Sequence, residues 1–239
     1  MKNTLEPASS AITGVQHTLR NLRPLFFDGL TPSELEPVIQ AAMQIKAEAA
    51  SIITNQDDSA ERLFLLLTGC ARYFLLTDKG KKVILHWIRP GQTFGTTALM
   101  STPGRYILST ETVRTSSMLA WDRATIRRLA TRYARLLDNA FSESVRYLTV
   151  YRAAHMALVS DTASRRLAQV LISLATGIGQ NAEGGVELKI RNEELANEAN
   201  VTLFTASRLL NRWQRAGVLS KGRGKIVLRS PELLLRSDT

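Results

Sequence analysis

Two short helical patterns separated by a tight turn lie near the C-terminal end of the chain, and this pair constrains the fold more than any other feature. The first pattern covers residues 192–199, with Asn192 as its cap, and the second covers residues 202–215. A polar residue before each pattern and Gly217 after the second are typical boundaries of helices. Since the connection is so short, the two helices must pack against each other. The spacing therefore predicts a helix-turn-helix over residues 192–215.

The second helix of this pair has two distinct faces. One face is apolar and is expected to pack on the first helix, where Ala196 is small enough to allow a close approach. Its residues are Ala206, Leu209, Leu210 and Trp213. The opposite face follows helical spacing through Leu203, Phe204, Ser207, Arg208 and Asn211. A recognition helix inserts a face of this kind into the major groove of DNA, where Arg208 can donate two hydrogen bonds to one guanine.

Positive charge surrounds the predicted helix pair. Residues 218–230 are typical of two short strands joined by a glycine-rich turn, which would form a basic wing. The whole chain has a net charge of +10, and a basic protein gains affinity for DNA by releasing counterions from the phosphates. We therefore predict a DNA interface. The expected contacts to bases and phosphates are Arg191, Thr202, Leu203, Phe204, Thr205, Ser207, Arg208, Asn211 and Lys225.

Residues 122–160 contain neither proline nor glycine and predict a long helix. Many of its residues fall into the seven-residue repeat of a coiled coil. The residues expected on the seam are Leu137, Phe141, Leu148, Tyr151, His155 and Leu158, together with Ala134 and Ser144. Because Ser144 and His155 are poor core residues, two interpretations stay open. The helix either pairs with a second copy of the chain, which we favour, or packs on its own domain.

The N-terminal half has the pattern of a small antiparallel β-structure. Short apolar or alternating runs are separated by turns such as that at Pro90 and Gly91. These runs lie at residues 64–69, 71–77, 82–88 and 117–122. Many short strands at this spacing predict a small barrel or jelly roll.

The C-terminal part begins with a further helix, capped at Asp161 and Thr162 and ended near Gly179, which is followed by a short strand at residues 188–190. We therefore expect an α+β protein with three parts. These are a β-roll domain with N-terminal helices over residues 1–121, a dimerisation helix over residues 122–160 and a winged helix-turn-helix over residues 161–239.

Other classes of function find little support in the sequence. We find no nucleophile elbow, phosphate-binding loop or His-Glu-x-x-His motif, so no catalytic residue and no enzymatic activity are expected. The single cysteine, Cys70, cannot supply the four thiolates of an iron–sulfur cluster and is expected to be buried, and no metal site is expected. No apolar run is long enough to span a membrane, and the first residues lack the apolar stretch of a secretory signal, so we expect a cytoplasmic protein.

On these residues the chain resembles the CRP/FNR superfamily, the cyclic-AMP receptor and fumarate–nitrate regulators, over about residues 20–230. Leu67-Thr68-Gly69 and the run RPGQTFG at residues 89–95 resemble the glycine turns of the family's β-roll. The run at residues 200–219 is similar to its recognition segment, with Arg208 at the family's arginine. The resemblance implies a homodimer, a roughly palindromic site in double-stranded DNA, RNA polymerase as a partner, and an effector or signal that acts at a cyclic-nucleotide-type roll.

Two departures from the family's pattern change these expectations. Phe204 stands where the family usually carries a glutamate that accepts from a base amino group, so the half-site is expected to differ. The roll also lacks the family's ribose-binding glutamate, and we therefore expect no strong binding of cyclic AMP. The resemblance implies an effector pocket at Gly95, Thr96, Thr97, Arg105, Tyr106 and Tyr151.

The cofactor is left open by the sequence, as is any sensing role of Cys70. A haem-based gas sensor is one alternative, and its candidate ligands are His17, His86 and His155. His155 could also respond to pH, because histidine titrates near neutrality. Another alternative is an effector-binding signalling module whose helix-turn-helix serves contact with a protein.

Overall fold

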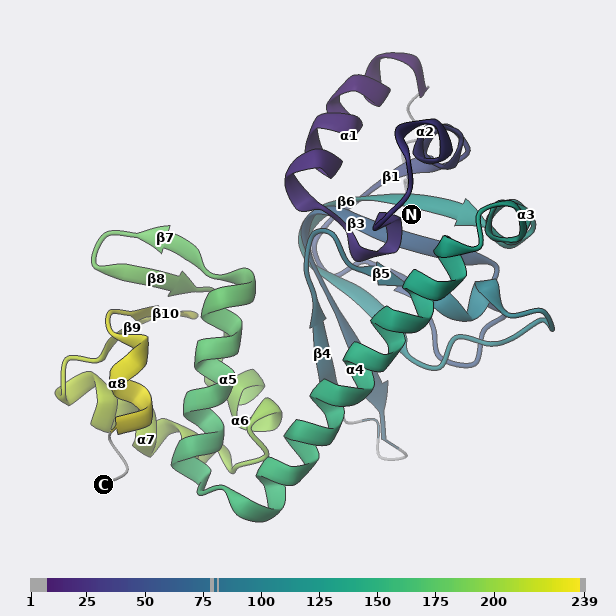
Figure 1. The fold of residues 1–239 in the computed structure, drawn as a ribbon. Helices are drawn as coiled ribbons and strands as arrows, with labels where there is room; N and C mark the ends of the chain where they lie inside the picture. Colours follow the sequence, from purple (N-terminus) through teal and green to yellow (C-terminus); the bar gives the residue numbers. More distant parts are fainter. Residues whose placement is uncertain (1–7, 78–79, 81, 237–239) are drawn as a thin grey trace. The chain divides into compact units, whose positions relative to one another are not determined.

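The computed structural model describes residues 8–77, 80 and 82–236 (Figure 1). The chain divides into two compact units, the first ending at Leu148 and the second starting at Thr149. Helix α4 (Arg135–Ser160) contributes residues to both units. The first unit contains an antiparallel β-roll with helices, and the second contains a helix-turn-helix with a small sheet. The expected α+β class is therefore confirmed.

The first unit is built around one antiparallel sheet. Strands β3 and β6 form its centre, with β1 beside β6 and β4 beside β3, while β2 pairs with β6 and β5 pairs with β3. The strands are β1 (Met43–Ala47), β2 (Ile52–Thr54), β3 (Arg62–Leu76), β4 (Lys82–Ile88), β5 (Thr93–Phe94) and β6 (Ser109–Asp122). Because side chains alternate along a strand, β3 sends Leu65 into one core and Leu66 into another.

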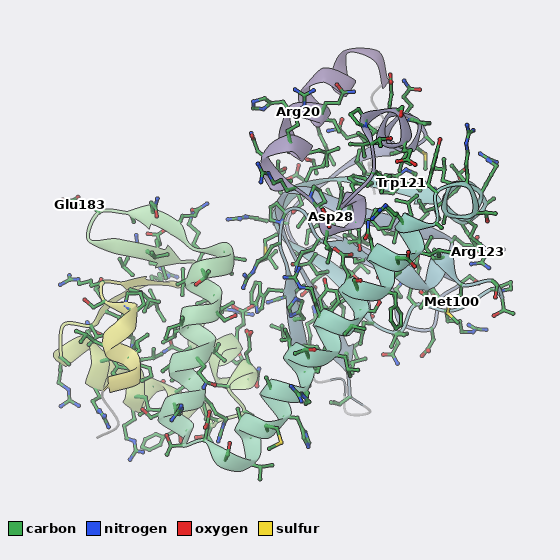
Figure 2. All side chains as sticks on the ribbon, viewed as in Figure 1. Arg20, Asp28, Met100, Trp121, Arg123 and Glu183 are labelled. Atoms are coloured by element: carbon green, nitrogen blue, oxygen red, sulfur yellow. The ribbon has the colours of Figure 1, made fainter. Side chains whose placement is uncertain are left out.

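Helices cover one of these two cores. They are α1 (Ala8–Leu22), the 3-10 turn η1 (Leu25–Phe27), α2 (Pro32–Gln40), α3 (Arg123–Arg132) and the start of α4 (Figure 1). Trp121 is fully buried in this core, and its indole N–H donates to the backbone carbonyl of Val38 at 2.7 Å (Figure 2). Its ring lies 6.2 Å from the rings of both Phe26 and Phe27. These contacts attach the N-terminal helices to the sheet.

The prediction of separate strands at residues 64–69 and 71–77 was wrong, because both runs belong to β3. The pairing of β3 with β6 shifts register at three places between Leu66 and Ala71, so the strand bends instead of ending. Gly69 lies in this bend with φ +92°, and a Cβ atom there would stand 2.6 Å from the Cα atom of Ser116. The glycine marks a close backbone approach inside a strand.

The prediction of one uninterrupted helix over residues 122–160 was also wrong. Asp122 caps α3 by accepting from the backbone N–H of Thr125 at 2.8 Å. The helix then stops at Tyr133, whose φ of −121° and ψ of 83° are not helical. Ile126 of α3 and Ala140 of α4 pack into the same core, whereas a straight helix would separate them by about 21 Å. The break lets both helices bury apolar residues in that core.

The second unit combines four further helices with a four-stranded sheet. In chain order the elements are α5 (Ala163–Ile178), β7 (Gln180–Ala182), β8 (Gly185–Leu188), α6 (Asn192–Glu198), α7 (Leu203–Arg215), β9 (Leu219–Gly222), β10 (Lys225–Leu228) and α8 (Pro231–Arg236). The sheet order is β7-β8-β10-β9, and all pairs are antiparallel. The predicted cap at Thr162, the helix end at Gly179 and the two strands of the wing are confirmed.

The strand expected at residues 188–190 lies three residues earlier, as β8. It forms a hairpin with β7, which the sequence did not predict. Gly184 and Gly185 make the turn with φ of +81° and +147°. A Cβ atom at Gly185 would stand 2.0 Å from the carbonyl oxygen of Leu228, so this glycine also lets β10 pack closely.

Candidate nucleic-acid interface

The predicted helix-turn-helix is formed by α6 and α7. The N-cap of α6 is Arg191 and not Asn192, and its backbone N–H donates to the carboxylate of Glu194 at 3.0 Å. Thr202 caps α7, because its hydroxyl accepts from the backbone N–H of Thr205 at 3.1 Å. Asn200 has a φ of +48° between the two helices, a conformation that asparagine tolerates better than most residues. Local hydrogen bonds thus determine where α6 and α7 each begin.

The two helices bury the faces that the sequence pattern predicted. On α7 the buried residues are Ala206, Leu209, Leu210 and Trp213. They meet Leu195 and Ala196 of α6, which are also buried. Ala196 additionally accepts from the backbone N–H of Val201 at 2.9 Å, which closes the turn. This packing fixes which side of α7 faces solvent.

The outward side of α7 carries large side chains in solvent. Phe204 is 77% exposed and Leu203 is 52% exposed. Arg208 and Asn211 are exposed on the same helix, whereas Thr205 and Ser207 are half-buried. Exposed aromatic and aliphatic side chains next to an arginine form a surface that is suited to contact another macromolecule. Base contacts by these residues stay a prediction.

The wing is attached to this helix by a side-chain hydrogen bond. Lys221 of β9 donates to the side-chain oxygen of Asn211 at 2.7 Å. Lys225 of β10 instead forms an ion pair with Glu187 of β8 at 2.8 Å, and this contact lowers the pKa of Glu187. Lys221 therefore lies directly beside the recognition face, whereas Lys225 would have to leave its carboxylate to reach a phosphate.

Arg166 of α5 is a functional candidate that sequence reasoning missed. Its guanidinium donates to the carbonyls of Ala199 at 3.0 Å and of Asn200 at 3.2 Å, both in the turn between α6 and α7. It also donates to the carbonyl of Asp161 at 2.7 Å, just after the end of α4. No sequence pattern distinguishes it from the neighbouring Arg165, which also lies in the first turn of α5.

The residues expected to line an effector pocket are held largely by the roll's own backbone. Tyr106 is buried, and its hydroxyl accepts from the N–H of Arg62 and donates to the carbonyl of Arg62, both at 3.0 Å. Burial raises the pKa of this hydroxyl. Gly95 lies beside it with φ +76°, where a Cβ atom would stand 2.7 Å from the same carbonyl oxygen. Both residues have clear structural roles.

The other candidate effector residues do not share one environment. Thr96 and Thr97 belong to the 3-10 turn η2 (Thr96–Leu99), where the Thr97 hydroxyl is buried without a hydrogen-bond partner among the described residues. Arg105 is exposed and donates to the carbonyl of Asp57. Tyr151 lies on α4 within the second unit. Of the predicted effector residues, the structure thus brings Gly95 and Tyr106 together, while the guanidinium of Arg105 is bonded to Asp57.

A buried polar cluster joins α4 to the β-roll in the first unit. Glu143 is hydrogen-bonded to the hydroxyl of Thr93, and burial raises its pKa. Tyr147, one turn later, stands edge-on to His86 with ring centroids 4.8 Å apart. Within the described residues, the Nε2 atom of His86 is buried without a hydrogen-bond partner. Burial, with a smaller contribution from Arg89, lowers the pKa of His86 to about 4.

Sequence reasoning missed Glu143 and Tyr147. Their spacing of four residues on a helix was the available signal, because it places both on one face, away from the predicted seam. The predicted seam itself is largely exposed. Its residues Leu137, Phe141, Leu148, His155 and Leu158 are exposed, and Tyr151 is half-buried. Val145 and Val159, which were not predicted, extend the same apolar strip along α4.

The described residues offer little for a metal or a membrane. No group of three histidine, cysteine, aspartate or glutamate side chains in this part of the chain could hold a metal ion. None of the described helices is long and apolar enough to cross a bilayer. Cys70 is buried, as expected.

Two family models match the chain. The model of the cyclic nucleotide-binding domain matches residues 44–133, which contain the β-roll. The model of the Crp-like helix-turn-helix domain matches residues 165–237. The two matches follow each other in the order in which the β-roll and the helix-turn-helix occur.

Known proteins of similar length match most of the chain. The cyclic AMP receptor protein of Thermus thermophilus is 29% identical over 216 residues, which cover 87% of this chain and 94% of that protein. The nitrogen fixation regulation protein FixK of Bradyrhizobium diazoefficiens is 21% identical over 204 residues, which cover 84% of each. The solved structure of FixK2 from Bradyrhizobium japonicum has a TM-score of 0.69 at 23% identity and covers 83% of this chain and 98% of that one. The likeness to FixK2 shows a shared fold.

Proposed function

Because the chain belongs to the CRP/FNR superfamily of transcription regulators, we propose that it acts as a homodimer that binds a roughly palindromic DNA site under the control of a signal at its β-roll. Two further relatives are named as a transcriptional regulator and a transcriptional activatory protein, and we propose no catalytic role for this chain. A regulator of transcription works where the DNA is, so we propose a cytoplasmic location and RNA polymerase as a further partner.

The observation that carries this proposal is the outward face of α7. Phe204 and Leu203 leave large apolar areas in solvent, and Arg208 lies beside them. In the major groove, the methyl group of thymine offers an apolar surface, and guanine offers two acceptors to one arginine. We propose that Arg208 contacts a guanine and that Phe204 contacts a thymine methyl, where the family usually has an acidic residue.

The phosphates on either side need positive charge and N–H or O–H donors. Thr202 and Thr205 lie at the N-terminal end of α7, where the partial positive charge of the helix also attracts phosphate. Arg191 caps α6 and is exposed apart from its 3.5 Å contact with Glu194. We propose phosphate contacts for these three residues, and for Lys221 through its position beside Asn211.

Dimerisation is proposed for the exposed strip of α4. Phe141 is 72% exposed and Leu148 is 69% exposed, which is costly for a helix that remains in water. A second copy of the helix would bury both residues in a seam and would present two helix-turn-helix units to one duplex, as a palindromic site requires.

The signal at the roll is proposed to be something other than cyclic AMP. Thr96 follows Gly95 at the position where the family carries the acidic residue that binds a ribose, and Tyr106 is bonded to the backbone of Arg62. His86 packs edge-on against Tyr147, and we propose no haem there. We therefore derive no step through either group.

The test is binding of the purified full-length protein to genomic fragments and to random duplexes at several salt concentrations. On the selected fragment, Arg208→Ala should weaken binding by about 1–3 kcal/mol, which is the range for a bidentate guanine contact. It should change binding to random DNA much less. Arg215→Ala is the charge-matched control, because it removes an arginine two turns further along α7.

Two results would count against the proposal. Equal losses on selected and random DNA would mean that Arg208 does not contact a base. Affinity for every genomic fragment at the level of random DNA would favour the alternative that the helix-turn-helix contacts a protein.

A further inference from the structure

A cavity of about 460 Å³ lies in the first unit among α1, η1 and α2. Its lining residues fall between Gln16 and Ile39, so it is separate from the helix-turn-helix and from the candidate effector residues of the roll. Leu19, Phe27 and Ile39 are buried core residues and form its apolar part. This volume is within the range of sites that bind small organic molecules.

The acidic and basic side chains that line the cavity differ in whether they already have hydrogen-bond partners. Arg20, in the last turn of α1, and Arg23, just after this helix, line it, and Asp28 and Glu36 line it as well. Figure 2 labels Arg20 and Asp28. Glu36 accepts a hydrogen bond from Gln40 at 3.0 Å. Among the described residues, neither guanidinium has an ion-pair or side-chain hydrogen-bond partner. Both side chains are exposed, and each guanidinium presents paired N–H donors that suit a carboxylate.

We propose that this cavity binds an amphipathic carboxylate with an unbranched apolar chain, the chemistry of a medium-chain fatty acid. The apolar chain lies against Leu19, Phe27 and Ile39, and the carboxylate accepts hydrogen bonds from Arg20 and Arg23. Transfer of the chain from water onto apolar side chains supplies the binding energy, and the arginines supply the selectivity for an anion.

The wall of the cavity is bonded to α4. The side-chain amide of Asn139 donates to the carbonyls of Phe26 at 3.1 Å and Asp28 at 2.9 Å. Gly29, with φ +70°, packs so closely on Arg135 that a Cβ atom would stand 2.6 Å from its Nη1 atom. Since residues 27–29 line the cavity, a bound ligand would act on the start of α4. An effect on DNA affinity through this route rests on the proposed function.

The test uses three probes with the same ten-carbon chain: decanoate, decanol and decyltrimethylammonium, each below its micelle concentration. Calorimetry on the full-length protein should show one decanoate per chain, bound at least about tenfold more tightly than decanol, as expected for a charge-assisted hydrogen bond. The cation should bind most weakly. Arg20→Gln with Arg23→Gln should reduce decanoate binding to the level of decanol and leave decanol unchanged. Arg128→Gln, an exposed arginine on α3, is the matched control.

A second measurement tests whether decanoate binds in this cavity and not elsewhere on the protein. Trp121 packs on Phe27, which lines the cavity, while Trp213 lies in the other unit. With 5-fluorotryptophan incorporated, decanoate should shift the ¹⁹F resonance of Trp121 and leave that of Trp213 in place. Leu35→Trp should fill the cavity and abolish both the shift and the heat of binding.

Several outcomes would overturn the proposal. Equal affinity for decanoate and decanol in all variants would remove the arginines from recognition, and preference for the cation would mean that Asp28 and Glu36 dominate. Absence of binding would exclude this ligand. One decanoate bound per two chains, and lost when the protein is diluted, would indicate that a second copy of the chain occupies or completes the cavity. Because binding is measured without DNA, these results are independent of the proposed function. Decanoate that binds but leaves DNA affinity unchanged would overturn only the link to α4.

Discussion

The guanidinium of Arg166 donates to the carbonyl of Ala199 at 3.0 Å, which joins the first turn of α5 to the turn of the helix-turn-helix. The same side chain donates to the carbonyl of Asp161, the residue that follows α4. One arginine thereby satisfies backbone acceptors at the end of the proposed dimer helix and at the DNA-binding turn. A planar group with five donors can do this, whereas an ammonium group cannot reach several carbonyls at fixed angles.

Replacing Arg166 should therefore destabilise the second unit. Arg166→Ala leaves three carbonyls without this partner, and we expect a loss of about 1–3 kcal/mol in the free energy of unfolding. Arg166→Lys should recover only part of it. Urea unfolding measures the effect, with Arg165→Ala as the control, because Arg165 is largely exposed and has only a 3.7 Å contact with Asp161. Equal effects of Arg165→Ala and Arg166→Ala would show that the hydrogen bonds to the turn contribute little.

The bend of β3 gives a second prediction. Gly69→Ala must adopt a positive φ and must also place its Cβ atom against Ser116, so we expect destabilisation by more than about 2 kcal/mol. Gly224→Ala has a similar φ of +70° but meets no atom within 4 Å, so it pays only the backbone cost. Thermal unfolding of the two variants separates steric from backbone strain. Similar losses in both would mean that the bend relaxes to admit a side chain.

These two sites show what the sequence can and cannot predict. Elements with strong local periodicity, such as α5 and α7, are where the pattern expects them, because caps and stop glycines lie next to them in the chain. Gly69 was interpreted as the end of a strand, since a glycine that terminates pairing and one that bends a strand look alike. The difference depends on Ser116, which lies far away in the sequence.

In the candidate site too, features set by local sequence were predicted and features set by tertiary packing were not. The outward residues of α7 follow from helical spacing alone. The structure exposes Leu203, Phe204, Arg208 and Asn211, and it leaves Ser207 half-buried. The contacts of Arg166, and the ion pair between Lys225 and Glu187, depend on tertiary packing and have no signature in the sequence. The effector residues were assigned by resemblance, and packing gives Tyr106 a bond to Arg62 that no local pattern could reveal.

The partly buried imidazole of His86 predicts a dependence of stability on pH. Its pKa is about 4 in the folded protein, below the ordinary histidine value of 6.5, so the unfolded chain binds the proton more readily. The stabilising effect of the neutral ring is fully present above pH 6.5 and is lost as pH falls toward 4, by about 3 kcal/mol at most.

The His86→Phe variant should lose this slope, and urea unfolding between pH 4 and pH 7 measures it. Glu143 acts in the opposite direction, because its raised pKa makes stability fall as pH rises above 4.5. Glu143→Gln is therefore the control that should keep the His86 slope and remove the opposing one. An unchanged slope in His86→Phe would assign the pH dependence to other groups.

Phe204 should determine part of the preferred DNA sequence. Because this side chain is exposed, Phe204→Glu should leave the free energy of unfolding within about 0.5 kcal/mol of the original value. A carboxylate there can accept from the amino group of cytosine or adenine, so duplexes selected from a random library should change at one position in each half-site. Phe204→Ala should weaken binding without creating a new preference. An identical consensus for all three proteins would place Phe204 outside the groove.

The exposed strip of α4 gives the most direct test of the quaternary structure. Phe141→Glu places a charge at a position that is 72% exposed in the single chain, so the fold should tolerate it. In a dimer seam, the same change would bury two like charges and remove two aromatic rings, and we expect the dimer to lose about 2 kcal/mol or more. Sedimentation velocity across a range of concentrations measures the shift from dimer to monomer. Ser142→Glu adds the same charge one residue along the helix, off the seam, and should leave the dimer intact. If Phe141→Glu stays dimeric with unchanged affinity, the chains do not pair through this face of α4, and the two helix-turn-helix units would have to be brought to a palindromic site by another surface.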